Sequence, residues 1–246
     1  MRIALWSGPR SGSTALMYSF AQRPDTRVLD EPLFGHFLAL TGAMRPSRED
    51  VLKSMPTSRH EALASLEPRA TDDVLFCKHM ANHIEGIPWS MLDGDDVKHI
   101  LLVRHPDGVL PSYTAHMEAP TMTDVCYEHQ RLLSDHLGSR AIVLTAESLH
   151  AHPESTLTRL CDALNLPWDA RMLRWTPGPR PEDGVWAKHW YAGVHASSGW
   201  EPRPLRRGRI DPSLTALREA CLAHYLELQS RATLFSDDSH GQTQHP

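Results

Sequence analysis

The residues best suited to chemistry lie near the start of the chain, where a short apolar run enters a loop rich in glycine and serine. Arg2–Ser7 leads into Gly8–Thr14, which reads GPRSGST, and a helical pattern begins at once. A strand, a glycine-rich turn and a helix N-terminus in this order direct backbone N–H groups and the positive end of a helix dipole towards an anion. The pattern therefore predicts a phosphate-binding loop with Arg10 beside the bound group.

This loop differs from the one that binds nucleoside triphosphates. The triphosphate loop reads G-x-x-x-x-G-K-[ST], with the lysine on the β- and γ-phosphates and the hydroxyl on magnesium. Here the segment from Gly8 to Gly12 is one residue shorter between the glycines, and Ser13 stands where the lysine belongs. Without that lysine, triphosphate hydrolysis loses a main source of charge stabilisation. The dinucleotide fingerprint G-x-G-x-x-G is absent as well.

A second candidate phosphate site follows the continuously apolar stretch in Val97–Val103. Arg104 comes directly after it, and Ser112 stands eight residues further on. Arginine presents a planar fork of donors to a phosphate, and a serine two turns into the next helix can add one hydrogen bond. Arg104 could instead cap a helix or pair with Asp107. Two anion motifs in this order, each after a predicted strand, favour a nucleotide-binding site more strongly than either motif alone.

Both motifs resemble those of sulfotransferases that use 3′-phosphoadenosine 5′-phosphosulfate (PAPS). Pro9–Thr14 is similar to their 5′-phosphosulfate loop, and Arg104 with Ser112 is similar to their 3′-phosphate motif. The resemblance covers about Met1–Thr145, and it implies PAPS as co-substrate, 3′-phosphoadenosine 5′-phosphate (PAP) as product and no metal. It implies that the nucleotide contacts the following residues: Arg10, Ser11, Gly12, Ser13, Thr14, Arg104, Ser112 and Arg207.

Two features near this site depart from the family pattern. Arg206–Arg209 is similar to an Arg-Lys-Gly segment that grips the 3′-phosphate in cytosolic sulfotransferases, but its spacing differs. A solvated basic face before a helix is the alternative for this cluster. Ala15 stands where cytosolic members carry a tryptophan that helps to hold the adenine. We therefore expect the adenine to be held in another way.

Sulfuryl transfer needs a base for the acceptor's proton, cations for the developing charge and three reacting atoms in line. In the resemblance, Arg10 takes the place of the loop cation that stabilises the transition state. Lys78 ends a predicted strand, as a lysine does in tyrosyl-protein and cytosolic sulfotransferases. It is the second expected cation, with a solvated surface charge as the alternative.

Two residues compete for the role of the base. Glu31 resembles the catalytic glutamate of tyrosyl-protein sulfotransferases in its spacing from the loop arginine, and Asp30 is a candidate supporting carboxylate. His79 is the rival, because cytosolic members place a histidine after this strand in a Lys-x-His pattern, here shifted by one position. Glu31 could also be a first-turn carboxylate that stabilises a helix N-terminus. The spacing favours Glu31.

Other residues suggest weaker roles. His79 and His83 have the i,i+4 spacing of one helix face, but spacing identifies no third ligand, so no metal site is predicted. Ser197 or Ser198 resembles a serine that contacts the sulfonate in related enzymes. A group of aromatic residues could line an apolar acceptor pocket or pack a C-terminal lobe, namely Trp186, Trp190, Tyr191 and Trp200.

Strand-like and helix-like stretches alternate along the chain. The predicted strands are Arg2–Ser7, Arg27–Leu29, Val74–Lys78, Val97–Val103 and Ala141–Thr145. The predicted helices are Gly12–Gln22, Glu31–Thr41, Ser58–Leu66, Asp107–His116, Thr123–Leu137, Pro153–Leu164 and Leu214–Leu234. This alternation predicts parallel pairing with ligands at the carboxyl ends of the strands. The expected fold is α/β, a three-layer sandwich around a parallel sheet of about five strands, similar to P-loop nucleoside triphosphate hydrolases.

Length and composition limit the number of domains, the possible partners and the cellular compartment. The 246 residues fit one domain, with a nucleotide-binding core at 1–145, a helical and lid part at 146–235 and a flexible tail at 236–246. A net charge of −5 argues against a nucleic-acid partner, and no apolar run is long enough for a bilayer. Four cysteines without C-x-x-C spacing favour a reduced, cytoplasmic chain. The stretch 177–204 lacks periodicity, which is typical of a lid or binding loop.

The resemblance to PAPS-dependent sulfotransferases implies that the protein moves a sulfuryl group from PAPS to a hydroxyl or similar nucleophile of a small molecule. Glu31 would be the base, while Arg10 and Lys78 would stabilise the group in transfer. Two alternatives stay open: an ATP-dependent kinase of the same superfamily, and a nucleotide-binding protein without catalysis. The expected partner is the small-molecule acceptor, with a homodimer as a further open alternative.

Overall fold

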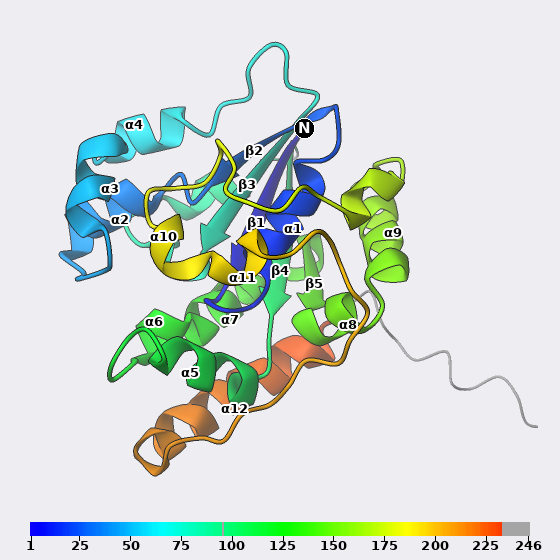
Figure 1. Cartoon of the computed structure of the whole chain (residues 1–246). Coiled ribbons are helices and arrows are strands. Elements are labelled where there is room, and N and C mark those ends of the chain that lie inside the picture. Colours follow the sequence, from blue (N-terminus) through cyan, green and yellow to red (C-terminus); the bar gives the residue numbers. More distant parts are fainter. Residues whose placement is uncertain (95, 233–246) are drawn as a thin grey trace, which may run out of the picture.

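Five parallel strands form the centre of the molecule, in the spatial order β2-β3-β1-β4-β5 (Figure 1). The computed structural model describes residues 1–94 and 96–232, so the predicted tail at 236–246 lies outside the described residues. The strands have these bounds: β1 Arg2–Ser7, β2 Thr26–Asp30, β3 Val74–Met80, β4 Val97–Val103 and β5 Ala141–Thr145. β2 and β3 lie on one side of β1, and β4 and β5 lie on the other, so the chain passes across β1 in the connection from β3 to β4. This change of direction creates a crevice at the carboxyl end of β1, where ligands bind in such sheets.

Helices cover both faces of the sheet, and the strands are apolar on both sides for that reason. Ile3 and Leu5 of β1 pack in one core, whereas Ala4 and Trp6 pack in the other. The first core lies under α1 (Ser13–Phe20), α8 (Ala146–Ala151) and α9 (Pro153–Leu164). The second lies under α4 (Arg59–Ala64), α5 (Pro106–Thr114), α7 (Tyr127–Leu137) and α12 (Thr215–Ser230). The predicted three-layer α/β sandwich with a P-loop-like parallel sheet is confirmed.

Several predicted helix boundaries are wrong, each for a local reason. The helix predicted at Glu31–Thr41 begins only at Phe34, as α2 (Phe34–Thr41), because Glu31 has a left-handed backbone with φ 47°. The stretch predicted as Thr123–Leu137 is split at Cys126, φ 67°, into α6 (Met122–Val125) and α7. Four short α-helices had no sequence prediction: α3 (Arg48–Ser54), α8, α10 (Ala187–Trp190) and α11 (Ala192–His195).

The C-terminal part supplies a covering segment, residues 177–204, which we call the lid segment. It contains two single-turn helices, α10 (Ala187–Trp190) and α11 (Ala192–His195), and it crosses near the carboxyl ends of the strands (Figure 1). Trp186, Trp190 and Tyr191 of this segment share a small core with α2 and α3, whereas Trp200 packs against the core under α1. The chain then runs through η5 (Pro212–Leu214) into α12. The remaining 3-10 turns are η1 (Ala81–Ile84), η2 (Trp89–Leu92), η3 (Gly138–Arg140) and η4 (Ala170–Leu173). No helix within the described residues is long and apolar enough to cross a membrane.

Candidate active site

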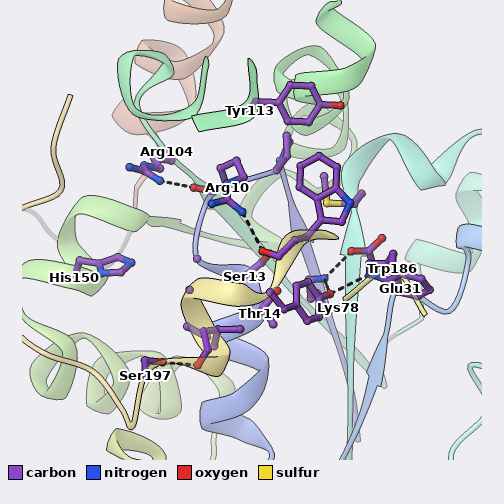
Figure 2. Close-up of a pocket in the computed structure, with 18 of the residues that line it drawn as sticks. Arg10, Ser13, Thr14, Glu31, Lys78, Arg104, Tyr113, His150, Trp186 and Ser197 are labelled. Atoms are coloured by element: carbon purple, nitrogen blue, oxygen red, sulfur yellow. Dashed lines mark hydrogen bonds and ion pairs between the residues drawn. The ribbon is translucent and has the colours of Figure 1, made fainter. Parts of the chain in front are cut away.

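A cavity of about 590 Å³ lies between the carboxyl ends of the strands and the lid segment. Its volume falls within the range of typical small-molecule sites. The predicted site residues that line it together are Arg10, Gly12, Ser13, Thr14, Glu31, Lys78 and Arg104. Figure 2 shows the labelled members of this set around the loop between β1 and α1. Ser11, His79, Ser112 and Arg207 lie outside the lining.

The loop after β1 is shaped by backbone conformations that open it towards the cavity. Gly12 is the N-cap of α1 with φ 90°, a left-handed conformation that glycine adopts without strain. The Ser11 hydroxyl donates to the Gly8 carbonyl at 2.8 Å, so Ser11 braces the loop from within. The first turn of α1 carries no acidic residue, and its N–H groups begin next to the cavity. This geometry suits an anion at Ser13 and Thr14.

Arg10 is fixed from two directions. Its Nε donates to the Ser112 hydroxyl at 2.8 Å, and its Nη1 donates to the Trp190 carbonyl of the lid segment at 3.1 Å. Burial lowers the pKa of Arg10 from its ordinary value, yet an arginine keeps its charge at neutral pH. The structure therefore brings Ser112 to the loop as a support for Arg10.

Arg104 reaches the same loop from the end of β4. Its Nη1 donates to the Arg10 carbonyl at 2.5 Å, as Figure 2 shows. Its side chain folds over the first turn of α5, where a Cβ on Gly108 would lie only 2.7 Å from Arg104 Nε. Glycine is thus required at position 108 for this rotamer. Within the described residues, Arg104 Nε is buried and has no hydrogen-bond partner, which fits a phosphate-binding arginine.

Arg207 is exposed and lies outside the cavity lining, on the segment that follows the lid. The Gly208 N–H donates to the Asp107 carbonyl at 2.7 Å, so this segment is attached to the start of α5. Burial, followed by the charge of Arg207, lowers the pKa of His105. The Arg207 charge therefore stands near the same helix end as Arg104, although its side chain does not reach the cavity wall.

Lys78 connects the two candidate carboxylates at the opposite end of the cavity. Asp30 and Lys78 are paired in register between β2 and β3, which puts their side chains on one face of the sheet. Lys78 Nζ lies 2.8 Å from Asp30 Oδ1 and 2.6 Å from Glu31 Oε1, and only 2% of its side chain is exposed. Its third proton goes to the Tyr191 hydroxyl at 2.8 Å. All three donors of the ammonium group are thus occupied.

Charge and burial oppose each other at Glu31. Burial raises the pKa of Glu31, the Lys78 ammonium lowers it, and Asp30 raises it again; the net direction is upwards. Burial lowers the pKa of Lys78, but Asp30 and Glu31 outweigh it and the pKa ends well above the ordinary 10.5. A carboxylate of increased basicity beside a permanently charged lysine suits a general base.

Both loop residues with candidate chemical roles have left-handed backbones. Arg10 has φ 58° and Glu31 has φ 47°. Such conformations are uncommon for residues other than glycine, and they concentrate at functional sites where the surroundings enforce them. At Glu31 the enforcement is visible, because its N–H donates to the Lys78 carbonyl at 2.8 Å.

His79 faces away from this arrangement. Successive residues of a strand point to opposite faces, so His79 lies on the other side of β3 from Lys78. Its ring stacks on Trp6 at 4.4 Å, it is 1% exposed, and burial lowers its pKa to about 3. The i,i+4 spacing of His79 and His83 does not correspond to one helix face in the structure, because His79 belongs to β3 and His83 to η1. Within the described residues no group of three metal-ligating side chains occurs.

The aromatic residues of the lid segment do line the cavity, and sequence reasoning missed some of their neighbours. Trp200 lies edge-on to Trp175, with ring centroids 5.9 Å apart, and to His150 at 5.1 Å. His150 also stands over the loop, 3.1 Å from where a Cβ on Gly12 would lie. Ser197 accepts a hydrogen bond from the Trp175 indole at 3.2 Å and lines the cavity, whereas Ser198 does not. Neither α8 nor Trp175 carried a motif that could have identified them.

Comparison with known proteins agrees with this geometry. Residues 1–232 match the family model described as a sulfotransferase domain. The chain belongs to the sulfotransferase family. Two solved structures share the fold of this sulfotransferase at low identity. One is the sulfotransferase domain of the Synechococcus PCC 7002 olefin synthase, with a TM-score of 0.57 and 19% identity; the match covers 92% of this chain and 94% of that chain. The other is a sulfotransferase from Alicyclobacillus acidocaldarius, with a TM-score of 0.55 and 10% identity; the match covers 94% of each chain.

Curated relatives of the sulfotransferase are longer proteins. It is 38% identical over 236 residues to branched-chain-amino-acid aminotransferase-like protein 1 of Arabidopsis thaliana, covering 94% of this chain and 40% of that protein. The like-named protein 2 is 38% identical over 228 residues, covering 91% of this chain and 40% of that protein. The chain thus spans about two fifths of the length of these relatives. Their names refer to a different activity and carry no argument for this chain.

Proposed function

We propose that this sulfotransferase moves the sulfuryl group of PAPS to the hydroxyl of a small molecule and releases PAP. One observation carries the proposal: a single cavity joins the anion loop with Arg10 and Arg104 to the buried pair of Glu31 and Lys78. The first half of this arrangement suits a nucleotide with two phosphate groups, and the second half suits removal of a proton from an acceptor.

The nucleotide would occupy the end of the cavity around α1. The 5′-phosphosulfate would meet Arg10 and the N–H groups at Ser13 and Thr14. The 3′-phosphate would meet Arg104, with Arg207 adding charge from outside. The adenine would pack against Trp200 and Trp175, which line the cavity on the side of Ala15 and supply the aromatic surface that position 15 lacks.

Transfer would then proceed by an in-line displacement. Glu31 takes the proton of the acceptor hydroxyl, the acceptor oxygen forms a bond to sulfur, and the bond from sulfur to the 5′-phosphate oxygen breaks. The electron pair leaves with PAP, where Arg10 and the N-terminus of α1 stabilise the charge that develops. Because all three Lys78 donors are occupied, Lys78 would act on the reaction through Glu31 unless one of these bonds is released.

The acceptor would lie beyond Glu31, between apolar walls that include Phe34, Met80 and Trp190. Arg45 and Asp124 also line this end, and they form an ion pair whose charges cancel. Burial lowers the pKa of His83 well below its ordinary value, so its ring is neutral. These features favour an uncharged alcohol or phenol with an apolar body.

The sequence of the loop argues against a kinase, because Ser13 replaces the lysine that would bind the β- and γ-phosphates. A protein without catalysis would have no use for a buried glutamate of raised pKa at the acceptor end of the same cavity. The left-handed backbone at Glu31 also favours a catalytic role, because it holds that carboxylate at the cavity wall.

Thermal unfolding with nucleotides tests the proposal. PAP at about 100 times its Kd should raise Tm by roughly 5–10 °C, as expected for a ligand that binds only the folded state of a chain of this size. Adenosine 5′-monophosphate, which lacks the 3′-phosphate, serves as the matched control and should shift Tm by much less. Stabilisation by ATP with magnesium and none by PAP would overturn the proposal in favour of a kinase.

A further inference from the structure

The hydroxyl of Tyr191 in the lid segment occupies the centre of the buried network around Lys78. It donates to Asp30 Oδ2 at 2.7 Å and accepts from Lys78 Nζ at 2.8 Å and from the Trp186 indole at 3.1 Å. The residue is only 4% exposed, and burial raises the pKa of its hydroxyl well above 10.0. Tyr191 is therefore a neutral and fully bonded phenol that touches two charged groups at once.

These contacts decide where Lys78 can point. A lysine ammonium has three protons, and here they go to Asp30, Glu31 and Tyr191. The ring of Tyr191 also lies close to the ammonium, with Nζ 5.2 Å from its centroid. Without the Tyr191 hydroxyl, one donor of a buried ammonium would lose its acceptor, and Nζ could turn away from Glu31 to regain one.

The lid segment also supports Asp30, the other acceptor of Lys78. Asp30 Oδ2 accepts from the Tyr191 hydroxyl and from the Gly184 N–H at 3.1 Å, and both donors come from the lid segment. Tyr191 lies 161 residues from Asp30 in the chain, so the bond exists only while the lid segment is closed over the strand ends. The orientation of this carboxylate thus depends on a distant part of the sequence.

Trp190, the lid residue before Tyr191, contacts Arg10 at the nucleotide end of the cavity. The Trp190 carbonyl accepts from Arg10 Nη1 at 3.1 Å, directly before Tyr191 in the chain. Two consecutive lid residues therefore contact the loop cation and the lysine beside the candidate base. Trp186 and Tyr191 are fixed in turn by the small core that they share with Phe34 and Phe37 of α2.

From these contacts we propose that Tyr191 is a positioning residue: its hydroxyl holds Lys78 on Glu31, so that the base is oriented only when the lid segment is closed. The inference rests on the proposed function for the identity of the base. It assigns to the lid segment a part in assembling the catalytic groups, in addition to covering the cavity.

The variant Tyr191→Phe tests this role, because it removes the hydroxyl and keeps the ring. Acceptor-dependent formation of PAP from PAPS is measured with 2-naphthol, 4-nitrophenol and benzyl alcohol as probes. Turnover should fall at least thirtyfold, while PAP affinity and KM for PAPS stay within threefold of the wild-type values. Trp186→Phe, which removes one donor to the same hydroxyl, should act in the same direction with a smaller loss.

A second readout follows Lys78 itself and needs no acceptor. Acetylation by N-hydroxysuccinimidyl acetate is followed by mass spectrometry, with the exposed Lys53 as internal reference. Lys78 should react at least tenfold faster, relative to Lys53, in Tyr191→Phe than in the wild type. Tyr225→Phe is the matched control, since it removes a hydroxyl from a buried tyrosine of α12 and should change neither readout.

The proposal is overturned if Tyr191→Phe keeps turnover within threefold of the wild type, or if Lys78 acetylation is unchanged. An equal loss of PAP affinity and turnover would also contradict it, because that pattern indicates general damage to the cavity. Failure of the wild type to bind PAP would instead refute the proposed function. In that case the acetylation rates alone decide whether Tyr191 holds Lys78.

Discussion

Replacing Glu31 with glutamine should lower the rate of sulfuryl transfer by about 10²–10⁴-fold, the usual contribution of a general base. Glutamine keeps the size of the side chain and can still accept the hydrogen bond from Lys78 Nζ, now 2.6 Å from Glu31 Oε1. It cannot take a proton from the acceptor. Because the nucleotide end of the cavity is untouched, PAP should still stabilise the variant. Initial rates of PAP formation and thermal shifts measure the two effects separately.

The pH dependence of the same reaction gives the sign of the pKa shift at Glu31. The base acts in its ionised form, and burial, opposed by Lys78, raises the pKa of Glu31 above 4.5. The rate of transfer should therefore decline as the pH falls through that raised pKa, in a range above pH 4.5. The residual activity of Glu31→Gln should not show this decline at low pH. His79→Gln is the comparison variant, since His79 stacks on Trp6 outside the cavity. Full activity in Glu31→Gln with loss in His79→Gln would reverse the assignment.

The substitution Arg10→Gln should reduce kcat by about 10²–10³-fold, the loss found when a group that stabilises transition-state charge is removed. The guanidinium is held beside the loop by Ser112 and by the Trp190 carbonyl. Charge on the group in transfer and on the leaving phosphate develops as the bond to sulfur breaks, so the loss should fall mainly on kcat and less on PAP affinity.

Arg10→Lys is the matched control, because it keeps the positive charge but loses the fork of donors that reaches both partners. It should retain more activity than Arg10→Gln. If the two variants lose equal activity, geometry matters more than charge. If Arg10→Gln transfers at the wild-type rate, Arg10 has no catalytic role and the loop serves binding alone.

Much of the fold could be predicted from the sequence, because the strands and helices follow from local patterns. Buried parallel strands are continuous apolar runs, and the predicted β1, β4 and β5 have the bounds that the structure shows. Residues that directly follow parallel strands share one edge of the sheet, so Arg10, Glu31 and Arg104 could be expected near one another. The structure places all three on one cavity.

Other features depend on information that short patterns lack. In β3 both faces are buried, so alternation could not tell whether Lys78 or His79 faces the site. The turns α10 and α11 have four residues each, too few for a helical period. Tyr191 meets Lys78 across 113 residues of sequence, and neither residue alone signals that contact. The break at Cys126 likewise had no glycine or asparagine to mark it.

Transfer of labelled sulfate from PAPS to a simple hydroxyl compound tests the central role of this cavity most directly. The wild-type protein is incubated with ³⁵S-labelled PAPS and 2-naphthol, 4-nitrophenol or benzyl alcohol, and Glu31→Gln serves as the matched blank. We expect a labelled sulfate ester and PAP in equal amounts from the wild type, with almost none from the variant. Absence of ester with every probe, together with phosphoryl transfer from ATP and magnesium to the same compounds, would contradict the assignment.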